Sequence, residues 1–145
     1  MKIYKLNLSL RECLDKEWIV TNGIGGFASS TICFANTRRY HSLLTAPTKR
    51  NGIRRVFLSK IDESIIVENL EYPIYTNMSK DYISKGYEKL EIFEKDIFPK
   101  AIFKIESKDK IKNEEDIYIE KEVFMETGKN TVCMIYTVTT SLRGA

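Results

Sequence analysis

Residues 131–139 alternate their side chains with a period of two. In an extended conformation, Val132, Met134, Tyr136 and Val138 would share one side, and Thr131, Cys133, Ile135, Thr137 and Thr139 the other. This period is typical of a β-strand with one buried face. Similar short runs lie at residues 55–61, 64–68, 90–93, 101–105 and 117–125. Because turn residues separate the runs, the pattern predicts an all-β fold.

Turn signals refine this prediction. Residues 126–130 separate the last two runs and include Gly128, which can adopt a positive φ, so the two runs are expected to form a hairpin. Pro99 is expected at an edge strand or at the start of a strand. The one candidate helix window, residues 79–94, contains Gly86 and several aromatic side chains that favour strands. A helix there is therefore disfavoured.

Length and composition bound the other possibilities. The chain has 145 residues, 43% hydrophobic and 30% charged, which fits one globular domain. No segment reaches the roughly 20 apolar residues of a membrane span, and no signal peptide is evident, so a cytoplasmic protein is expected. Cys13, Cys33 and Cys133 are few and widely spaced, which favours reduced thiols without a metal site. No cofactor is expected, and the charged residues 108–116 are expected to form an exposed loop.

Charge is unevenly distributed along the chain. Between Glu17 and Asp62 there is no acidic residue but seven basic ones, Arg38, Arg39, Lys49, Arg50, Arg54, Arg55 and Lys60. That segment carries +7, residues 62–145 carry −5 and residues 1–17 carry +1, which gives the net charge of +3. The basic segment is compatible with nucleic-acid binding or with an acidic or hydroxyl-rich partner.

A glycine-rich element spans residues 22–28 and formally fits a relaxed dinucleotide-binding pattern. A nucleotide-binding turn would open a helix, but residues 29–34 are β-branched and aromatic, and no acidic residue follows about twenty positions on. Gly23, Gly25 and Gly26 are therefore expected to form tight turns or to let another backbone approach closely.

The densest group of functional side chains lies in residues 36–44. It holds two arginines, a tyrosine and the one histidine of the chain. If the segment is a strand, Arg38 and Tyr40 share one face while Arg39 and His41 share the other, and either face could bind a sugar. The alternative is that Arg39 and His41 satisfy buried carboxylates or carbonyls at a domain interface while Tyr40 packs.

The order of several spaced segments carries a resemblance. The segments are residues 17–29, 36–41, 43–44, 58–63, 86–87, 90–91, 93, 96, 98–99, 119–121, 123–125, 128 and 130–131. In this order they resemble the N-terminal domain of bacterial and archaeal glycogen debranching enzymes. Ser42 departs from the family pattern, which has glycine after the histidine, and its side chain is expected to narrow the approach to that loop.

The resemblance implies an antiparallel, supersandwich-like β-sandwich that precedes a helical (α/α) barrel. In this family the barrel carries the amylo-α-1,6-glucosidase activity, a glycoside hydrolysis on glycogen. Residues 1–145 would then be a partial N-terminal domain, a fragment or truncated product without the barrel. The implied partners are the barrel of the same enzyme and, through it, α-glucan. A sandwich that stops midway is also expected to expose unpaired strand edges and an apolar face, and therefore to be poorly stable or to self-associate.

No catalytic residue is assigned. Glycoside hydrolysis usually needs two carboxyl groups across the scissile bond, and Asp62 and Glu63 are expected to be exposed at a turn, on opposite faces, with ordinary acidities. Trp18 is expected in the core rather than against a sugar. The same holds for four phenylalanines, Phe93, Phe98, Phe103 and Phe124.

The candidate substrate-binding or domain-interface residues are Asn22, Gly23, Gly25, Gly26, Arg38, Arg39, Tyr40 and His41. Both segments are expected to lie near each other on the surface that faces the barrel. The alternative function is a stand-alone basic module for nucleic acid, although the sequence holds no recognised nucleic-acid-binding motif.

Overall fold

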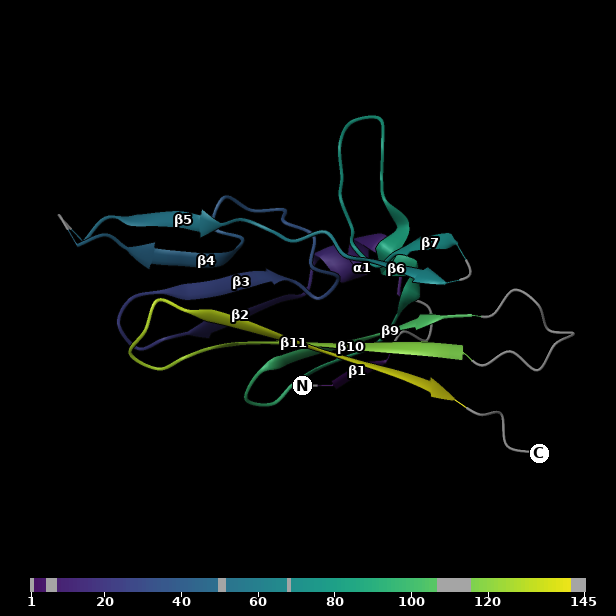
Figure 1. Cartoon of the computed structure of the whole chain (residues 1–145). Coiled ribbons are helices and arrows are strands. Elements are labelled where there is room, and N and C mark those ends of the chain that lie inside the picture. Colours follow the sequence, from purple (N-terminus) through teal and green to yellow (C-terminus); the bar gives the residue numbers. More distant parts are fainter. Residues whose placement is uncertain (1, 5–7, 50–51, 68, 107–115, 142–145) are drawn as a thin grey trace, which may run out of the picture.

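The computed structural model describes residues 2–4, 8–49, 52–67, 69–106 and 116–141 (Figure 1). Its strands are β1 (Lys2–Tyr4), β2 (Glu17–Thr21), β3 (Phe27–Thr31), β4 (Ser42–Pro47), β5 (Arg54–Leu58), β6 (Ser64–Val67), β7 (Leu70–Pro73), β8 (Leu90–Lys95), β9 (Pro99–Ile105), β10 (Asp116–Met125) and β11 (Val132–Ser141). The helices are α1 (Leu10–Leu14) and the short 3₁₀ helix η1 (Lys85–Lys89). The predicted all-β class is confirmed.

The strands form three antiparallel sheets. The five-stranded sheet has the order β1-β8-β9-β10-β11, the four-stranded sheet β2-β3-β4-β5, and β6 pairs with β7 alone. Figure 1 shows the four-stranded sheet above β10 and β11. Buried residues from both large sheets belong to one hydrophobic cluster, with Trp18 and Ala28 on one side and Phe103 and Val123 on the other. The predicted antiparallel β-sandwich is therefore confirmed.

The aromatic residues are only partly where the sequence placed them. Trp18 is buried as predicted, and its indole Nε1 donates to the Thr31 carbonyl over 2.9 Å. Phe93 and Phe103 are also buried. The prediction is wrong for Phe98, which is exposed because it belongs to the β8–β9 turn. Its ring instead contacts half-buried Phe124, with centroids 5.4 Å apart.

Most predicted strands and turns are present. The β10–β11 hairpin is confirmed, with Gly128 at φ +78°, and Pro99 begins β9. The window 79–94 holds η1 and then β8 rather than an α-helix. Gly86 is required within η1 because a Cβ atom there would lie 2.1 Å from the Tyr75 carbonyl oxygen. The loop expected at 108–116 lies outside the described residues, except for Asp116, which begins β10.

The sequence analysis missed α1. This helix begins after Ser9, whose hydroxyl accepts from the Glu12 amide while the Glu12 carboxylate accepts from the Ser9 amide. This capping box was visible in the sequence as Ser followed three residues later by Glu. In the part of the chain that the structure describes, no helix has the length and apolarity of a membrane span. Cys13 on α1 and Cys33 are buried and Cys133 is half-buried, and none of the three forms a disulfide among the described residues.

A buried ion pair lies inside the sandwich. Lys121 points inward from β10 with its side chain 1% exposed, and its Nζ lies 2.6 Å from Glu63 Oε1. The Tyr136 hydroxyl donates to the same oxygen, and Lys121 Nζ lies 4.0 Å from the centroid of the Phe34 ring. Burial lowers the pKa of Lys121, and the charge of Glu63 acts in the opposite direction. The prediction that Glu63 is exposed is therefore wrong.

This pair generates a stability prediction. Glu63→Ala leaves the Lys121 ammonium buried without its carboxylate, so we expect the free energy of unfolding to fall by about 3–5 kcal/mol. The double variant Glu63→Leu/Lys121→Met removes both charges and is expected to be clearly more stable than the single variant. Urea unfolding of the wild type and both variants measures this. A double variant no more stable than Glu63→Ala would contradict the explanation.

Candidate functional site

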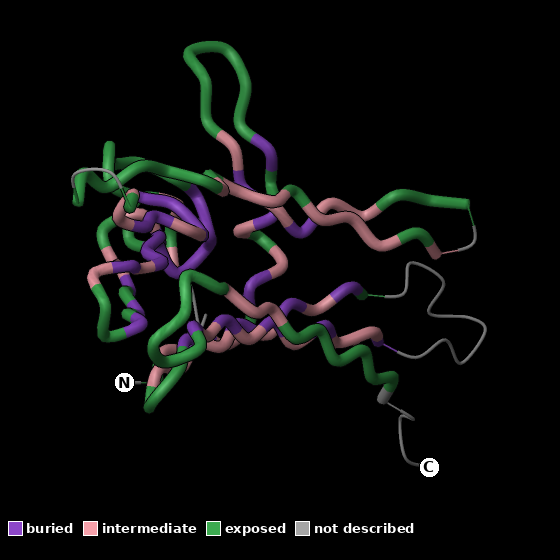
Figure 2. The backbone as a smooth tube through the Cα atoms, turned by 60° about the vertical axis from the view of Figure 1, so that its left-hand side comes forward, coloured by how far each residue is buried: buried purple, intermediate pink, exposed green. Residues whose placement is uncertain are grey.

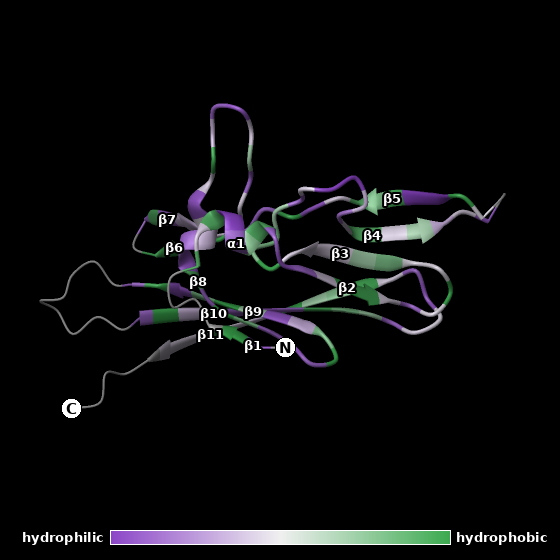
Figure 3. Cartoon of the chain, turned by 180° about the vertical axis from the view of Figure 1, so that it is seen from behind, coloured by the Kyte–Doolittle hydropathy of each residue, from purple (hydrophilic) through white to green (hydrophobic). Residues whose placement is uncertain are grey.

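The glycine-rich segment is the turn of the β2–β3 hairpin, and Asn22 organises it. Asn22 is buried, and its Oδ1 accepts from the amides of Ile24 and Gly26 at 3.1 and 2.8 Å. Its Nδ2 donates to the Lys129 carbonyl and to Asn130 Oδ1, both at 2.9 Å. Figures 1 and 3 show the β2–β3 and β10–β11 turns side by side. Asn22 therefore joins the two hairpins.

The glycines in this turn serve the same contact. Gly23 and Gly25 have φ values of +77° and +92°, which other residues rarely adopt. A Cβ atom at Gly26 would lie 2.4 Å from Asn22 Nδ2, so glycine leaves room for the amide. The Gly25 carbonyl accepts from Arg54 Nε over 2.8 Å. The expectation of tight turns and close approach is confirmed, and the approaching groups belong to this chain.

Residues 37–41 form a turn before β4 rather than a strand. The predicted faces are therefore wrong: Arg39 is exposed, while the side chain of His41 is fully buried. Ser42 is buried as well, and its hydroxyl lies 2.6 Å from that of Thr45. The Ser42 side chain is thus packed within β4, and it does not narrow the approach to the exposed loop.

Glu17, at the start of β2, contacts several side chains of this turn. Its carboxylate forms an ion pair with Arg38 Nε and accepts from the Tyr40 hydroxyl over 2.9 Å. His41 Nε2 lies 3.6 Å from Glu17 Oε1. The hydrogen bond from Arg38 lowers the pKa of Glu17, and the hydrogen bond to Glu17 raises that of Tyr40. The sequence analysis did not single out Glu17, which is the last acidic residue before the basic segment.

His41 holds the turn from inside. Its Nδ1 accepts from the backbone amides of Thr37 and Arg38 at 3.0 and 3.3 Å. An acceptor nitrogen carries no proton, so these contacts assign a neutral imidazole with its proton on Nε2. Burial lowers the pKa of His41, although the Glu17 charge acts in the opposite direction. His41 therefore has a structural contact of its own with the backbone.

The structure does not bring the two candidate segments together. The β2–β3 register pairs Glu17 with Thr31 at one end and Thr21 with Phe27 at the other. The Arg38–Tyr40 side chains meet β2 at Glu17, whereas the Asn22 turn follows its other end. A strand rises about 3.3 Å per residue, so roughly 13 Å of strand separates the two ends. The expectation that these segments are neighbours is wrong.

The adjacent acids Asp62 and Glu63 are bound to other side chains and do not form a catalytic pair. Asp62 Oδ1 lies 2.7 Å from Lys60 Nζ, and Asp62 Oδ2 accepts from the Asn77 side-chain Nδ2 over 2.5 Å. Burial acts to raise the pKa of Asp62, but the hydrogen bonds from Lys60 and Asn77 lower it. The expectation of ordinary acidity is therefore wrong for Asp62. Within the described ranges, no group of three His, Cys, Asp or Glu side chains could hold a metal ion.

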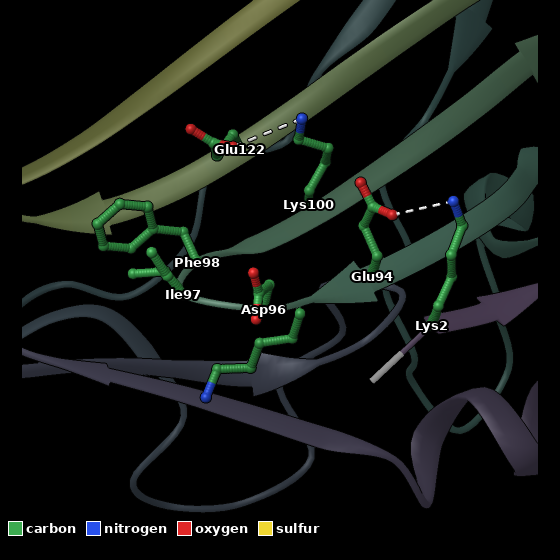
Figure 4. Close-up of a pocket in the computed structure, with 8 residues that line it drawn as sticks. Lys2, Glu94, Asp96, Ile97, Phe98, Lys100 and Glu122 are labelled. Atoms are coloured by element: carbon green, nitrogen blue, oxygen red, sulfur yellow. Dashed lines mark ion pairs between the residues drawn. The ribbon is translucent and has the colours of Figure 1, made fainter.

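A charged hollow that the sequence analysis did not single out lies at the β8–β9 turn (Figure 4). Its lining residues are Lys2, Glu94, Lys95, Asp96, Ile97, Phe98, Lys100 and Glu122. Lys2 Nζ lies 3.2 Å from Glu94, and Lys100 Nζ lies 3.7 Å from Glu122 and 3.0 Å from Glu120. These contacts pair cations with acids, an arrangement typical of a solvated surface rather than of a catalytic acid pair.

Comparison with known protein families matches residues 16–144 to the family described as glycogen debranching enzyme N terminal. The chain belongs to this family. The matched residues run from the start of β2 through β11 and include Asn22, the Arg38–His41 turn and the Glu63–Lys121 pair. The resemblance read from the sequence is thus confirmed, and the chain is a glycogen debranching enzyme N-terminal domain. No curated protein and no solved structure matches it.

The buried His41 predicts that the stability of this domain depends on pH. Its pKa in the folded chain lies below the ordinary value of 6.5, so the unfolded chain binds a proton more readily. Stability contributed by neutral His41 is therefore complete above that value and declines as the pH falls below it. Protonation of Nδ1 would also break both contacts with the Thr37 and Arg38 amides.

We expect the free energy of unfolding to fall more steeply from pH 7 to pH 5 in the wild type than in His41→Asn. Asparagine keeps an acceptor oxygen near the position of Nδ1 but does not titrate. Urea unfolding across this pH range measures the difference, and the carboxylates that do not contact His41 titrate alike in both proteins. Equal slopes would show that His41 contributes nothing to the pH dependence.

Proposed function

We propose that residues 1–145 act as the noncatalytic β-sandwich domain of a glycogen debranching enzyme in cytoplasmic glycogen breakdown. The domain packs on a helical (α/α) barrel that carries the amylo-α-1,6-glucosidase activity, and it shapes one side of the α-glucan cleft. The observation that carries this proposal is the family match over residues 16–144.

The pKa shifts of Glu17 and Asp62 and the partners of Glu63 support a noncatalytic role. A glycosidase acid needs a pKa raised toward neutrality so that it can protonate the leaving group. Glu17 and Asp62 have pKa values shifted in the opposite direction. Glu63 is bound by Lys121 and Tyr136 inside the sandwich. These groups stabilise the fold, so the chemistry is assigned to the barrel.

The exposed part of the 37–41 turn supports a docking role. Arg38 and Tyr40 are held by Glu17, while Arg39 between them is exposed. Among the described residues, Arg39 forms no hydrogen bond or ion pair, so its five N–H donors are available to a carboxylate or to sugar hydroxyls. We assign Arg39 as the contact with the barrel or its bound glucan.

Nucleic-acid binding has less support. Three cations of the basic segment are engaged within the chain: Arg38 with Glu17, Arg54 with the Gly25 carbonyl and Lys60 with Asp62. Charge used in this way is less available to neutralise phosphates. Of this segment's arginines in the described part of the chain, the other two, Arg39 and Arg55, are exposed and lie on different elements.

The purified chain is expected to release no glucose from a branched limit dextrin. The pKa values of Glu17 and Asp62 are lowered, whereas a general acid needs a raised pKa. A coupled glucose assay with chain purified free of host enzymes measures this. Glucose release that persists through further purification, and that Glu17→Gln or Glu63→Gln abolishes, would contradict the noncatalytic assignment.

The docking role is tested in the full-length enzyme with Arg39→Ala. We expect this variant to lower debranching activity about tenfold, as for the loss of one charge-assisted contact. Its thermal stability should remain unchanged because Arg39 is exposed. Arg55→Ala on β5 removes another exposed arginine and serves as the matched control, with activity expected near that of the wild type. Equal activity of the two variants would contradict a role for Arg39.

A further inference from the structure

Two of the three cysteines meet in the hydrophobic core. Cys13 lies on α1 and Cys33 lies two residues after β3, and both residues are completely buried. The Cys13 thiol donates a hydrogen bond to the Cys33 sulfur, although the two residues are 20 positions apart in the sequence. Cys133, on β11, is half-buried and belongs to neither segment. The fold therefore holds one specific pair of thiols in contact.

The turn after β3 holds the Cys33 sulfur in this position. Residues 28–35 form an unbroken buried stretch, drawn in purple in Figure 2. Within this stretch, the Thr31 hydroxyl lies 3.4 Å from Cys33 Sγ and also binds the amide and the carbonyl of Ala35, at 3.0 and 2.9 Å. Phe34 has a φ of +57°, a conformation that residues with a side chain rarely adopt. A strained backbone that its surroundings hold in place is common at functional sites.

The surroundings of Cys33 favour its thiolate. The hydrogen bond from Cys13 lowers the pKa of Cys33, burial acts to raise it, and the hydrogen bond with Thr31 lowers it further. The pKa of Cys33 therefore lies below the ordinary value for a thiol. Because the thiolate is the form that attacks a disulfide in an exchange reaction, these contacts suit Cys33 to be the attacking sulfur.

Cys13 belongs to a short helix with an exposed outer side. α1 has five residues, and its Arg11 and Glu12 are exposed. A helix of this length is stable only through its cap and its tertiary contacts, so it can open locally while both large sheets stay folded. Such an opening brings the buried pair within reach of a small reagent.

We propose that Cys13 and Cys33 are a redox-active dithiol that a small disulfide, such as glutathione disulfide, oxidises to an intrachain disulfide joining α1 to the turn after β3. The Cys33 thiolate attacks one sulfur of the oxidant, forms a mixed disulfide and releases one glutathione thiolate. The Cys13 thiol then loses its proton, and its sulfur attacks Cys33 Sγ and releases the second glutathione thiolate. Two electrons pass to the oxidant, and the two released thiolates take up the protons that the cysteines lost.

The position of the two cysteines makes this reaction selective. Three cysteines allow three intrachain pairings, and an unfolded chain samples all of them. In the folded chain only Cys13 and Cys33 are held in contact, so their disulfide forms with the least movement. The reaction involves neither Arg39 nor a glucan, so it stands apart from the proposed function.

Oxidation of the purified chain in glutathione redox buffers is the primary test. We expect intact-mass analysis to show the loss of two hydrogen atoms, and peptide mapping after alkylation to show one linkage, between Cys13 and Cys33. At a fixed glutathione concentration, half-oxidation of the folded chain should need about tenfold less glutathione disulfide than half-oxidation of the chain in urea, because the fold holds the two sulfurs in contact. Cys133→Ser is the matched control and should oxidise like the wild type, whereas Cys13→Ser should form no intrachain disulfide.

The wild-type result alone is decisive if the Cys13→Ser variant fails to fold. A folded wild type that stays reduced at oxidant concentrations that oxidise the unfolded chain would overturn the proposal. So would a linkage that includes Cys133 in place of the expected one.

Hydrogen exchange of the wild type gives a second measurement that needs no variant. The amides of Cys13 and Asp15 donate to the carbonyls of Ser9 and Arg11 at 3.1 and 2.9 Å. Because the disulfide ties α1 to the sandwich, oxidation should slow the exchange of these amides about tenfold and leave exchange in β10 unchanged. Equal exchange of the α1 amides in the reduced and oxidised chains would show that no such tie forms.

Discussion

The arrangement of the sandwich depends on the ion pair between Glu63 and Lys121. Lys121 points into the core between the inward residues Ile119 and Val123 of β10. A buried ammonium without a partner is strongly destabilising, so the segment that follows β5 has to bring a carboxylate to it. Glu63 does so across 58 positions of sequence and also accepts from Tyr136 on β11. One carboxylate thus joins three parts of the chain.

Two further polar contacts act in the same way at the two ends of β2. Asn22 ties the β2–β3 turn to the β10–β11 turn, and Glu17 ties the start of β2 to the turn that precedes β4. The apolar core supplies most of the driving force for folding, but it is not directional. These satisfied polar contacts are directional, and they select one arrangement of hairpins among those that would bury similar apolar area.

The polar side chains near the candidate site therefore serve as structural contacts. Glu17 and His41 hold the 37–41 turn in place, and the lowered pKa of the Glu17 carboxyl favours its ionised form. The family assignment names the N-terminal part of a glycogen debranching enzyme. Arg39, by contrast, is exposed, and we propose it as the group left for a partner.

The sequence by itself determined the all-β class, strands β5, β6, β8, β9, β10 and β11, the β10–β11 hairpin and the family, because two-residue periodicity, turn glycines and motif order are local properties of the chain. It also indicated that residues 22–26 form turns. Only the tertiary structure decided the partners of Glu17, Asn22 and Glu63, which lie between 21 and 108 positions away, apart from the contacts of Asn22 within its own turn. It also turned His41 inward and separated the two candidate segments. Strand register and sheet stacking create these contacts, and periodicity specifies a face of a strand but not which distant side chain will meet it.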